Sequence, residues 1–239
     1  MSSQFDYWKW VSWNPVTGCT KFSEGCRFCY ASEFAERLKS KGVEKYKKGF
    51  EPTLHYDVLD YPNRWKKPRM IFVTSMSDLL NEKVPDEFIF EVFKVMNATP
   101  RHVFQLLTKR AERLSLINNE VKWTPNIWMG VTVENKVVEN RIELLRNTGA
   151  RIKFLSCEPL IGSLQNIDLT GIDWIRAGEE TGKTPRPMKQ EWIEDLRIQC
   201  EQANVTLSLK NIDELNTRKD AMFRNGKKYN EEFQFDLFS

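Results

Sequence analysis

Short apolar runs alternate along the chain with stretches that have the periodicity of a helix. The apolar runs are rich in β-branched and aromatic residues, and such continuous hydrophobicity is typical of strands buried on both faces of a parallel sheet. An initial strand is expected near residues 10–15. The later runs occupy residues 70–75, 102–108, 127–133, 151–156, 173–178 and 205–210. Because strand and helix patterns alternate, the sequence predicts βαβ units with right-handed crossovers.

Between these runs, apolar positions recur every three to four residues, as on the buried face of a helix. The clearest example is 86–98, which Pro85 precedes and Pro100 ends. Other helical patterns cover residues 29–40, 137–148 and 190–203. About six or seven units are too few for a complete eight-unit barrel. The predicted fold class is α/β, a partial (β/α)6-type TIM-like barrel with parallel strands, and an open doubly wound sheet also fits the pattern.

Polar side chains gather where the predicted strands end. Ligands of barrels and of open parallel sheets bind at the carboxyl ends of the strands, so these positions predict the site. Contributions from several strands favour the barrel-like arrangement. The candidate residues there are Ser75, Ser77, Asp78, Lys109, Arg110, Glu134, Asn135, Cys157 and Glu158.

Composition limits the possible partners and cellular location of the protein. The chain has 239 residues and a formal net charge of +3, which permits a nucleic-acid partner without indicating one. No apolar run approaches the roughly 20 residues that a transmembrane helix needs, and the first ten residues lack the apolar core of a signal peptide. We therefore expect a cytoplasmic protein with no membrane partner. In that reducing setting, the five cysteines are more typical of metal binding or catalysis than of disulfides.

Three of the cysteines, Cys19, Cys26 and Cys29, have the spacing C-x6-C-x2-C. Thiolates are soft ligands that select zinc or iron–sulfur clusters. A structural zinc ion needs a fourth ligand, and the other candidates are not next to the triplet. A [4Fe–4S] cluster held by three thiolates keeps one iron without a protein ligand, where a cosubstrate can bind. The spacing favours the cluster, and a zinc-stabilised nucleic-acid-binding module without redox chemistry is the alternative.

Longer strings carry a resemblance. The loop "WNPVTGCTKFSEGCRFCYA" is similar to the cysteine loop of the radical S-adenosylmethionine (radical SAM) superfamily, although the commonest spacing there is C-x3-C-x2-C. Together with "IFVTSMSDLLNEKVP", "FQLLTKRAERL", "GVTVENK", "FLSCEPLIG" and "RPMKQEWIEDLRIQC", it more closely resembles a three-cysteine-motif family common in bacteriophages and prophages. The chain departs from that family at "AGEETG" and "LKNIDEL", both at strand ends. The resemblance implies a radical SAM core in a bacterial host cell.

The resemblance also implies roles for individual residues. Cys19, Cys26 and Cys29 would hold the cluster, beside the aromatic Phe28. The remaining roles are expected from position at the strand ends. Ser75, Ser77 and Asp78 would accept from the amino group of S-adenosylmethionine, and Lys109 or Arg110 would bind its carboxylate. Glu134 and Asn135 would accept from its ribose hydroxyls. Glu158 would take part in catalysis, and Cys157 is either a catalytic hydrogen-atom donor or a small residue buried in the core. An electron donor of the flavodoxin or ferredoxin type is the implied partner.

The expected substrate is a nucleobase, a nucleotide or modified phage DNA, changed by isomerisation, bond cleavage or another modification. Residues 1–211 are expected to form the barrel, with a basic, aromatic insertion at 41–69, and 212–239 a C-terminal extension that packs on the barrel or on a partner. The string "AGEETGKT" (177–184) formally matches a loose phosphate-binding loop. The nearby Pro185 and Pro187 disfavour the helix that such a loop requires, so we regard the match as accidental. The sequence does not specify the oligomeric state.

Overall fold

The computed structural model describes residues 9–181, 184–210, 221–224 and 227–229. Through them runs a nine-stranded sheet with the strand order β1-β4-β5-β6-β7-β8-β9-β10-β11. The first seven strands in this order are parallel to one another. They are β1 (Lys9–Trp13), β4 (Arg69–Val73), β5 (Val103–Thr108), β6 (Ile127–Thr132), β7 (Ile152–Cys157), β8 (Trp174–Gly178) and β9 (Thr206–Lys210).

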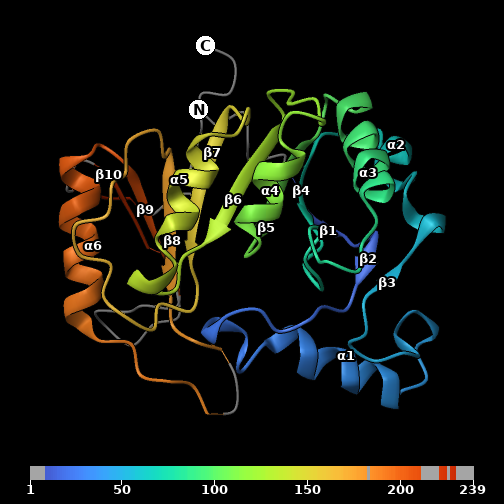
Figure 1. Cartoon of the computed structure of the whole chain (residues 1–239), viewed down its shortest axis with the longest axis horizontal. Coiled ribbons are helices and arrows are strands. Elements are labelled where there is room, and N and C mark those ends of the chain that lie inside the picture. Colours follow the sequence, from blue (N-terminus) through green and yellow to red (C-terminus); the bar gives the residue numbers. More distant parts are fainter. Residues whose placement is uncertain (1–8, 182–183, 211–220, 225–226, 230–239) are drawn as a thin grey trace.

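The parallel part of the sheet is curled (Figure 1). A cavity lies on the inside of this curl. Side chains from all seven parallel strands line this one cavity, from Trp10 on β1 to Lys210 on β9. A flat sheet of seven strands spans about 28 Å and could not bring its first and last strands to one cavity of this size. Within the described residues β1 pairs with β4 alone, so the seven parallel strands do not close into a complete barrel. The predicted α/β partial barrel is confirmed.

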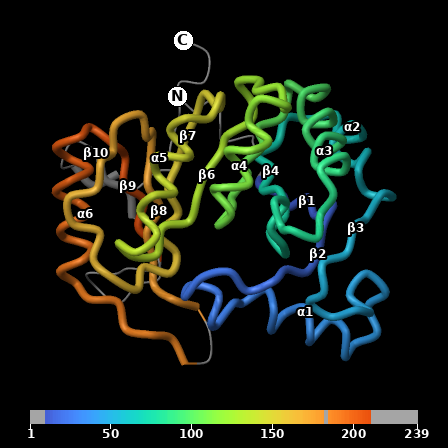
Figure 2. Tube along the Cα trace, in the orientation of Figure 1, coloured from blue at the N-terminus to red at the C-terminus, as the bar shows by residue number. Residues whose placement is uncertain are grey.

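Helices cover the outer face of the sheet and its strand ends. The helical elements are α1 (Tyr30–Ser40), α2 (Tyr61–Arg64), α3 (Asp86–Ala98), α4 (Ala111–Ile117), α5 (Asn140–Arg146) and α6 (Gln190–Gln202), with the 3₁₀ turns η1 (Glu24–Cys26), η2 (Glu44–Tyr46), η3 (Tyr56–Val58) and η4 (Lys136–Val138). A small second sheet pairs β2 (Val16–Thr17) with β3 (Thr53–Leu54). In Figures 1 and 2, α1 and the segment before it lie across one end of the large sheet.

Three of the four predicted helices agree with the structure. The patterns at 29–40, 86–98 and 190–203 are α1, α3 and α6. The pattern at 137–148 is divided into η4 and the shorter α5. No helix occurs between β7 and β8, where residues 158–173 are all described. Leu160 and Leu164 of that segment bury their side chains in the core, as a helix would.

Alternate residues of each strand face opposite sides of the sheet, which creates two apolar layers. Outward-facing residues such as Phe104, Leu155 and Ile175 join the large core under the helices. Inward-facing Trp128, Phe154 and Trp174 form a smaller cluster inside the curl. This inner cluster fills the lower part of the partial barrel and keeps the cavity at the other end, beside the carboxyl ends of the strands.

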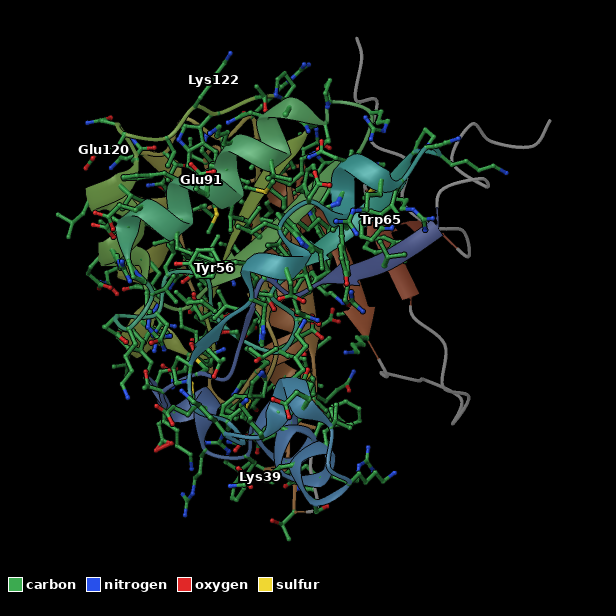
Figure 3. The ribbon with its side chains drawn as sticks, turned by 90° about the vertical axis from the view of Figure 1, so that its right-hand side faces the viewer. Lys39, Tyr56, Trp65, Glu91, Glu120 and Lys122 are labelled. Carbon is green, nitrogen blue, oxygen red and sulfur yellow. The ribbon has the colours of Figure 1, made fainter. Side chains whose placement is uncertain are left out.

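The basic insertion at 41–69 runs along the outside of the barrel from one end to the other. Figure 3 shows Lys39, on α1 just before the insertion, far from Trp65 near its end. Two of its aromatic side chains pack against the rest of the protein. Tyr46 is buried, and the Trp65 ring packs edge-on against the His102 ring, with ring centroids 6.0 Å apart. These aromatic residues of the insertion are therefore part of the packing of the protein.

Two further strands follow β9 in the sheet. β10 (Ala221–Arg224) pairs antiparallel with β9, and β11 (Lys227–Tyr229) pairs antiparallel with β10. They belong to the predicted C-terminal extension, whose other residues lie outside the described part of the chain, as do Gly182 and Lys183 of the phosphate-loop match. Among the described helices, none is both long enough and apolar enough to cross a membrane.

Candidate functional site

A cavity of about 390 Å³ opens at the carboxyl ends of the parallel strands. All three clustered cysteines, Cys19, Cys26 and Cys29, line it, and each is half-buried. Six of the strand-end residues predicted from the sequence line it as well. These are Ser75, Ser77, Asp78, Lys109, Arg110 and Glu158.

The cysteine loop leaves β2 through a constrained glycine. Gly18 has φ +78°, and a side chain there would place a Cβ 2.2 Å from the carbonyl oxygen of Glu51. Its N–H donates to the carbonyl of Met76 at 2.9 Å, which fixes the start of the loop against the end of β4. The loop then forms η1, and Cys29 occupies the N-cap position of α1. The three thiols therefore come from one short segment with a defined path.

Cys19 has polar neighbours around its sulfur. The Asn81 side-chain amide and the Arg110 guanidinium both point donors at it, with Nδ2 3.5 Å and Nη1 3.7 Å from Sγ. The pKa of the Cys19 thiol is raised to about 11, with burial as the largest cause and the charge of Asp78 as the next, while Arg110 and Asn81 act in the opposite direction. Metal coordination requires the deprotonated sulfur, so the donors on Arg110 and Asn81 favour the form that binds metal.

Asp78 and Arg110 form a buried ion pair beside that sulfur. Arg110 Nη1 lies 2.9 Å from Asp78 Oδ2, and Arg110 Nε lies 2.8 Å from Glu82 Oε1. Asp78 also accepts from the hydroxyl of Thr108, at 2.8 Å. Both charged groups therefore already have partners, which makes them positioning groups for the loop. Lys109 lines the same cavity, and no ion-pair partner for its ammonium group is found in the described residues.

Glu134 supports the cysteine loop from behind. Its carboxylate is 1% exposed, pairs with Arg141 at 2.7 Å and accepts a hydrogen bond from the Ser23 hydroxyl. Gly25 of η1 lies so close that a Cβ there would be 2.7 Å from Glu134 Cγ. Arg186 holds the loop from another side, because it pairs with both Glu180 and Glu24.

A strained turn follows β4 at the cavity wall. Thr74 is buried and has φ +57°, a left-handed conformation that is rare for a β-branched residue and costs on the order of 1–3 kcal/mol. Asn14 stabilises the turn, because its Oδ1 accepts from Ser75 Oγ and from the Met76 N–H, both at 3.2 Å. Tyr30 donates to the Ser75 carbonyl at 2.6 Å. Such strain is concentrated at binding and catalytic sites.

Four predicted site residues do not line the cavity: Phe28, Glu134, Asn135 and Cys157. The Asn135 side chain caps η4 by accepting from the Val137 N–H, at 3.0 Å. The Phe28 ring lies beneath the guanidinium groups of Arg27 and Arg186. Cys157 is fully buried in the outer core, and burial holds the pKa of its thiol well above the ordinary value.

On the opposite wall, the predicted Glu158 is joined by aromatic residues and by Arg176, which the sequence did not single out as a site. Aromatic side chains of the inner face form the floor, and Phe154 stacks on Trp174 with ring centroids 4.9 Å apart. Above them, Arg176 Nε lies 3.1 Å from Glu158 Oε1, and Lys210 Nζ lies 3.3 Å from Glu158 Oε2. Side chains alternate between the two faces of a strand. Counting back from each strand end in steps of two would have identified these inward-facing residues from the sequence.

Within the described residues, no group of three or more histidine, cysteine and carboxylate side chains is arranged to hold a single metal ion. The three clustered thiols border the same cavity without converging as ligands of one ion.

Comparison with solved structures finds weak likeness to spore photoproduct lyase. A variant of that enzyme with bound AdoMet and dinucleoside spore photoproduct is 12% identical, with a TM-score of 0.46, over 79% of this chain and 60% of the other. Spore photoproduct lyase complexed with the dinucleoside spore photoproduct is 14% identical, with a TM-score of 0.43, over 68% of this chain and 54% of the other. The chain thus spans little more than half the length of these proteins. Similarity at this level does not establish a shared activity.

No curated protein matches the sequence. The predicted membership of a phage family is not tested by these comparisons. One family model, however, extends over almost the whole chain. It is described as DUF5131, a protein of unknown function, and because it matches residues 4–236, the chain belongs to that family.

Proposed function

We propose that this protein is a radical S-adenosylmethionine enzyme whose [4Fe–4S] cluster is held by Cys19, Cys26 and Cys29. The observation that carries the proposal is that these three thiols and the polar strand ends line one cavity of a partial barrel. The motif resemblance in the sequence points to the same chemistry. The alternative from the sequence, a zinc-stabilised binding module, requires no such cavity.

The donor set fits a cluster of this kind. Three soft thiolates satisfy three irons and leave the fourth for a cosubstrate. Arg110 and Asn81 place N–H donors next to the Cys19 sulfur, where they would stabilise the negative charge of thiolate and cluster. When bound and reduced, such a cluster would supply the electron for cleavage of the S-adenosylmethionine sulfonium to methionine and a 5′-deoxyadenosyl radical.

The chain's own residues would bind and orient the cosubstrate. The strained turn after β4 presents the backbone and hydroxyls of Ser75 and Ser77 to the cavity, where the methionine amino group needs acceptors. Lys109 is the cation available for the methionine carboxylate, because the Arg110 guanidinium already binds Asp78 and Glu82. Asp78 and Glu134 already have partners in the protein, so their role in this proposal is to position the loop.

The substrate we propose is a nucleobase, a nucleotide or modified DNA. The floor of the cavity supports this class, because Trp10, Phe72, Phe154 and Trp174 offer aromatic faces on which a planar base can stack. The 5′-deoxyadenosyl radical would take a hydrogen atom from this substrate, and a lyase or isomerase reaction would follow. A flavodoxin- or ferredoxin-type protein in the bacterial cytoplasm would supply the electron.

Reductive cleavage of S-adenosylmethionine tests the function. The anaerobically reconstituted protein is mixed with dithionite and S-adenosylmethionine, and 5′-deoxyadenosine is measured by chromatography. We expect formation of 5′-deoxyadenosine that is abolished in Cys29→Ala. The matched control is Cys200→Ala, which removes a buried thiol of α6 that does not line the cavity and should retain the reaction. Absence of 5′-deoxyadenosine from fully reconstituted protein would refute the proposal.

A further inference from the structure

The wall of the cavity formed by β6, β7, β8 and β9 contains polar groups that the proposed cosubstrate site does not use. Backbone register places Thr132 of β6 beside Ser156 of β7, and Ser156 beside Arg176 of β8. Neighbouring strands are about 4.8 Å apart, so Thr132 and Arg176 stand about 10 Å apart with Ser156 between them. All three residues line the cavity. This wall therefore presents a row of two hydroxyls and a guanidinium.

Thr132 lacks a partner for its hydroxyl. The residue is 1% exposed, and its Oγ1 is buried without a hydrogen bond from the protein. Leaving a buried hydroxyl unpaired costs about 1–3 kcal/mol, so native structures rarely do it without a reason. Because Thr132 lines the cavity, a ligand that occupies this wall can supply the missing partner.

The next row brings Glu158 and Lys210 together across β8. Gly178 of β8 makes this possible, because a Cβ there would lie 3.3 Å from Lys210 Cβ and 3.6 Å from Glu158 Cγ. Glu158 bridges Lys210 and Arg176, so the three side chains carry a net charge of +1 and are only partly exposed. The ion pairs with Glu158 keep both cations at the cavity.

We propose that Thr132, Arg176 and Lys210 form an anion-binding subsite for a phosphate group of the substrate. The subsite lies above the stacked pair Phe154 and Trp174, so one ligand can place a base on the rings and a phosphate against the cations. The inference rests on the proposed function and narrows its substrate to a molecule with both groups. A free nucleoside monophosphate and a phosphodiester of a nucleic acid share this chemistry.

Calorimetry on the full chain tests the subsite without any turnover. The probes are the four deoxynucleoside 5′-monophosphates, the matching dinucleotides with one phosphodiester and the matching nucleosides. We expect at least one phosphate-bearing probe to bind about tenfold or more tightly than its nucleoside, as one charged hydrogen bond implies. Stronger binding of the monophosphate would identify a free nucleotide, and stronger binding of the dinucleotide a nucleic acid. Equal affinity for nucleoside and phosphate forms, or no binding, would overturn the proposal.

Two substitutions that break the same ion pair separate anion binding from a structural role. Lys210→Gln removes a cation, so it should weaken binding of the phosphate probe about tenfold and change nucleoside binding little. Glu158→Gln removes the competing carboxylate, so it should leave phosphate binding unchanged or tighter. Thr132→Val removes only the hydroxyl and should weaken phosphate binding severalfold. Parallel losses in Lys210→Gln and Glu158→Gln would indicate a structural pair and overturn the proposal.

Two further arms complete the test. Lys189→Gln changes an exposed cation that does not line the cavity, and it should bind every probe as the unaltered protein does. If Lys210→Gln weakens binding of S-adenosylmethionine as much as that of the phosphate probe, the subsite holds the cosubstrate carboxylate, and the proposal is wrong. Cleavage of S-adenosylmethionine is measured separately, so failure of the proposed function and failure of the subsite give different results.

Discussion

Buried charges hold the cysteine loop at the mouth of the cavity. Glu134 and Arg141 are 1% and 4% exposed as side chains, and Ser23 of the loop donates to the same carboxylate. A buried charge is tolerated when it is paired and hydrogen-bonded, and it is costly when its partner is removed. The loop and the core under β6 are therefore linked through one carboxylate.

Neutralising that carboxylate should destabilise the protein. Glu134→Gln leaves Arg141 buried without its counter-charge, so we expect the free energy of unfolding to fall by roughly 3 kcal/mol. Glu139→Gln, five residues along the chain, breaks only the half-exposed pair with Lys136 and should cost less than about 0.5 kcal/mol. Urea denaturation measures both. Similar effects of the two substitutions would contradict the role given to Glu134.

The link between Glu180 and Arg186 predicts a pH dependence. Hydrogen bonds from Arg186 hold the pKa of the Glu180 carboxyl below its ordinary value of 4.5, against the opposing effect of burial. A carboxyl whose pKa is lowered by folding adds stability at pH values above the ordinary pKa. That stability is lost as the pH falls through the pKa of the folded state.

Thermal melts of wild type and Glu180→Gln between pH 7 and pH 3 measure this effect. We expect wild type to be more stable at pH 7, and the difference to shrink below about pH 4.5 as the wild-type carboxyl becomes protonated. Glu191→Gln, which breaks an exposed pair with Lys189, should show only a small difference throughout. A difference between wild type and Glu180→Gln that grows as the pH falls would show that the sign is wrong.

At this scale, the sequence identifies residue types well and their partners poorly. The position of Arg110 after a strand predicts that it faces the cavity, and it does line it. Its pairing with Asp78 and Glu82 depends on residues about 30 positions away, which no local pattern encodes. In the sequence, Glu134 is a candidate hydrogen-bond acceptor for a ligand. In the structure, its carboxylate already binds Arg141 and the Ser23 hydroxyl.

Among the elements, β6 and β7 shape the cavity floor through one small residue. A Cβ at Gly130 of β6 would lie 2.3 Å from the Phe154 ring of β7, so glycine provides the space in which that ring lies flat against Trp174. The glycine thus sets the depth of the cavity, although its own backbone conformation is not unusual.

A double-mutant cycle tests this packing. Gly130→Ala alone should destabilise the protein by about 1–3 kcal/mol, because the added methyl group displaces the Phe154 ring. In the Phe154→Ala background the methyl group has room, so the same substitution should cost at least about 1 kcal/mol less. Chemical denaturation of the four proteins gives the coupling energy. Additive costs, within about 0.5 kcal/mol, would contradict the close approach.

Elements with a strong period were predicted, and elements defined by distant contacts were not. The apolar runs at 127–133 and 151–156 are strands whose apolar residues pack under the helices or inside the curl. By contrast, β2 and β3 are two residues long each, and their pairing joins segments about 37 residues apart. The segment 158–173 crosses from β7 to β8 without a helix, although its leucines fill the same layer of the core.

For the whole molecule, the curl of the sheet brings the cysteine loop, the strand ends and the aromatic floor to one cavity. Alternation of strands and helices predicted this architecture, because parallel strands joined by right-handed crossovers place all their carboxyl ends at one edge. The sequence predicted several of the side chains that share the cavity but not the complete set, since that set depends on how strongly the sheet curls. The cysteine motif is the one chemical feature that the sequence and the cavity define together.

The most direct measurement of the central claim is the metal content of protein prepared and reconstituted without oxygen. We predict about four iron and four sulfide ions per chain, lost together when Cys19, Cys26 and Cys29 are all replaced by alanine in a protein that remains folded. Stoichiometric zinc without iron, or no metal after reconstitution, would contradict the claim.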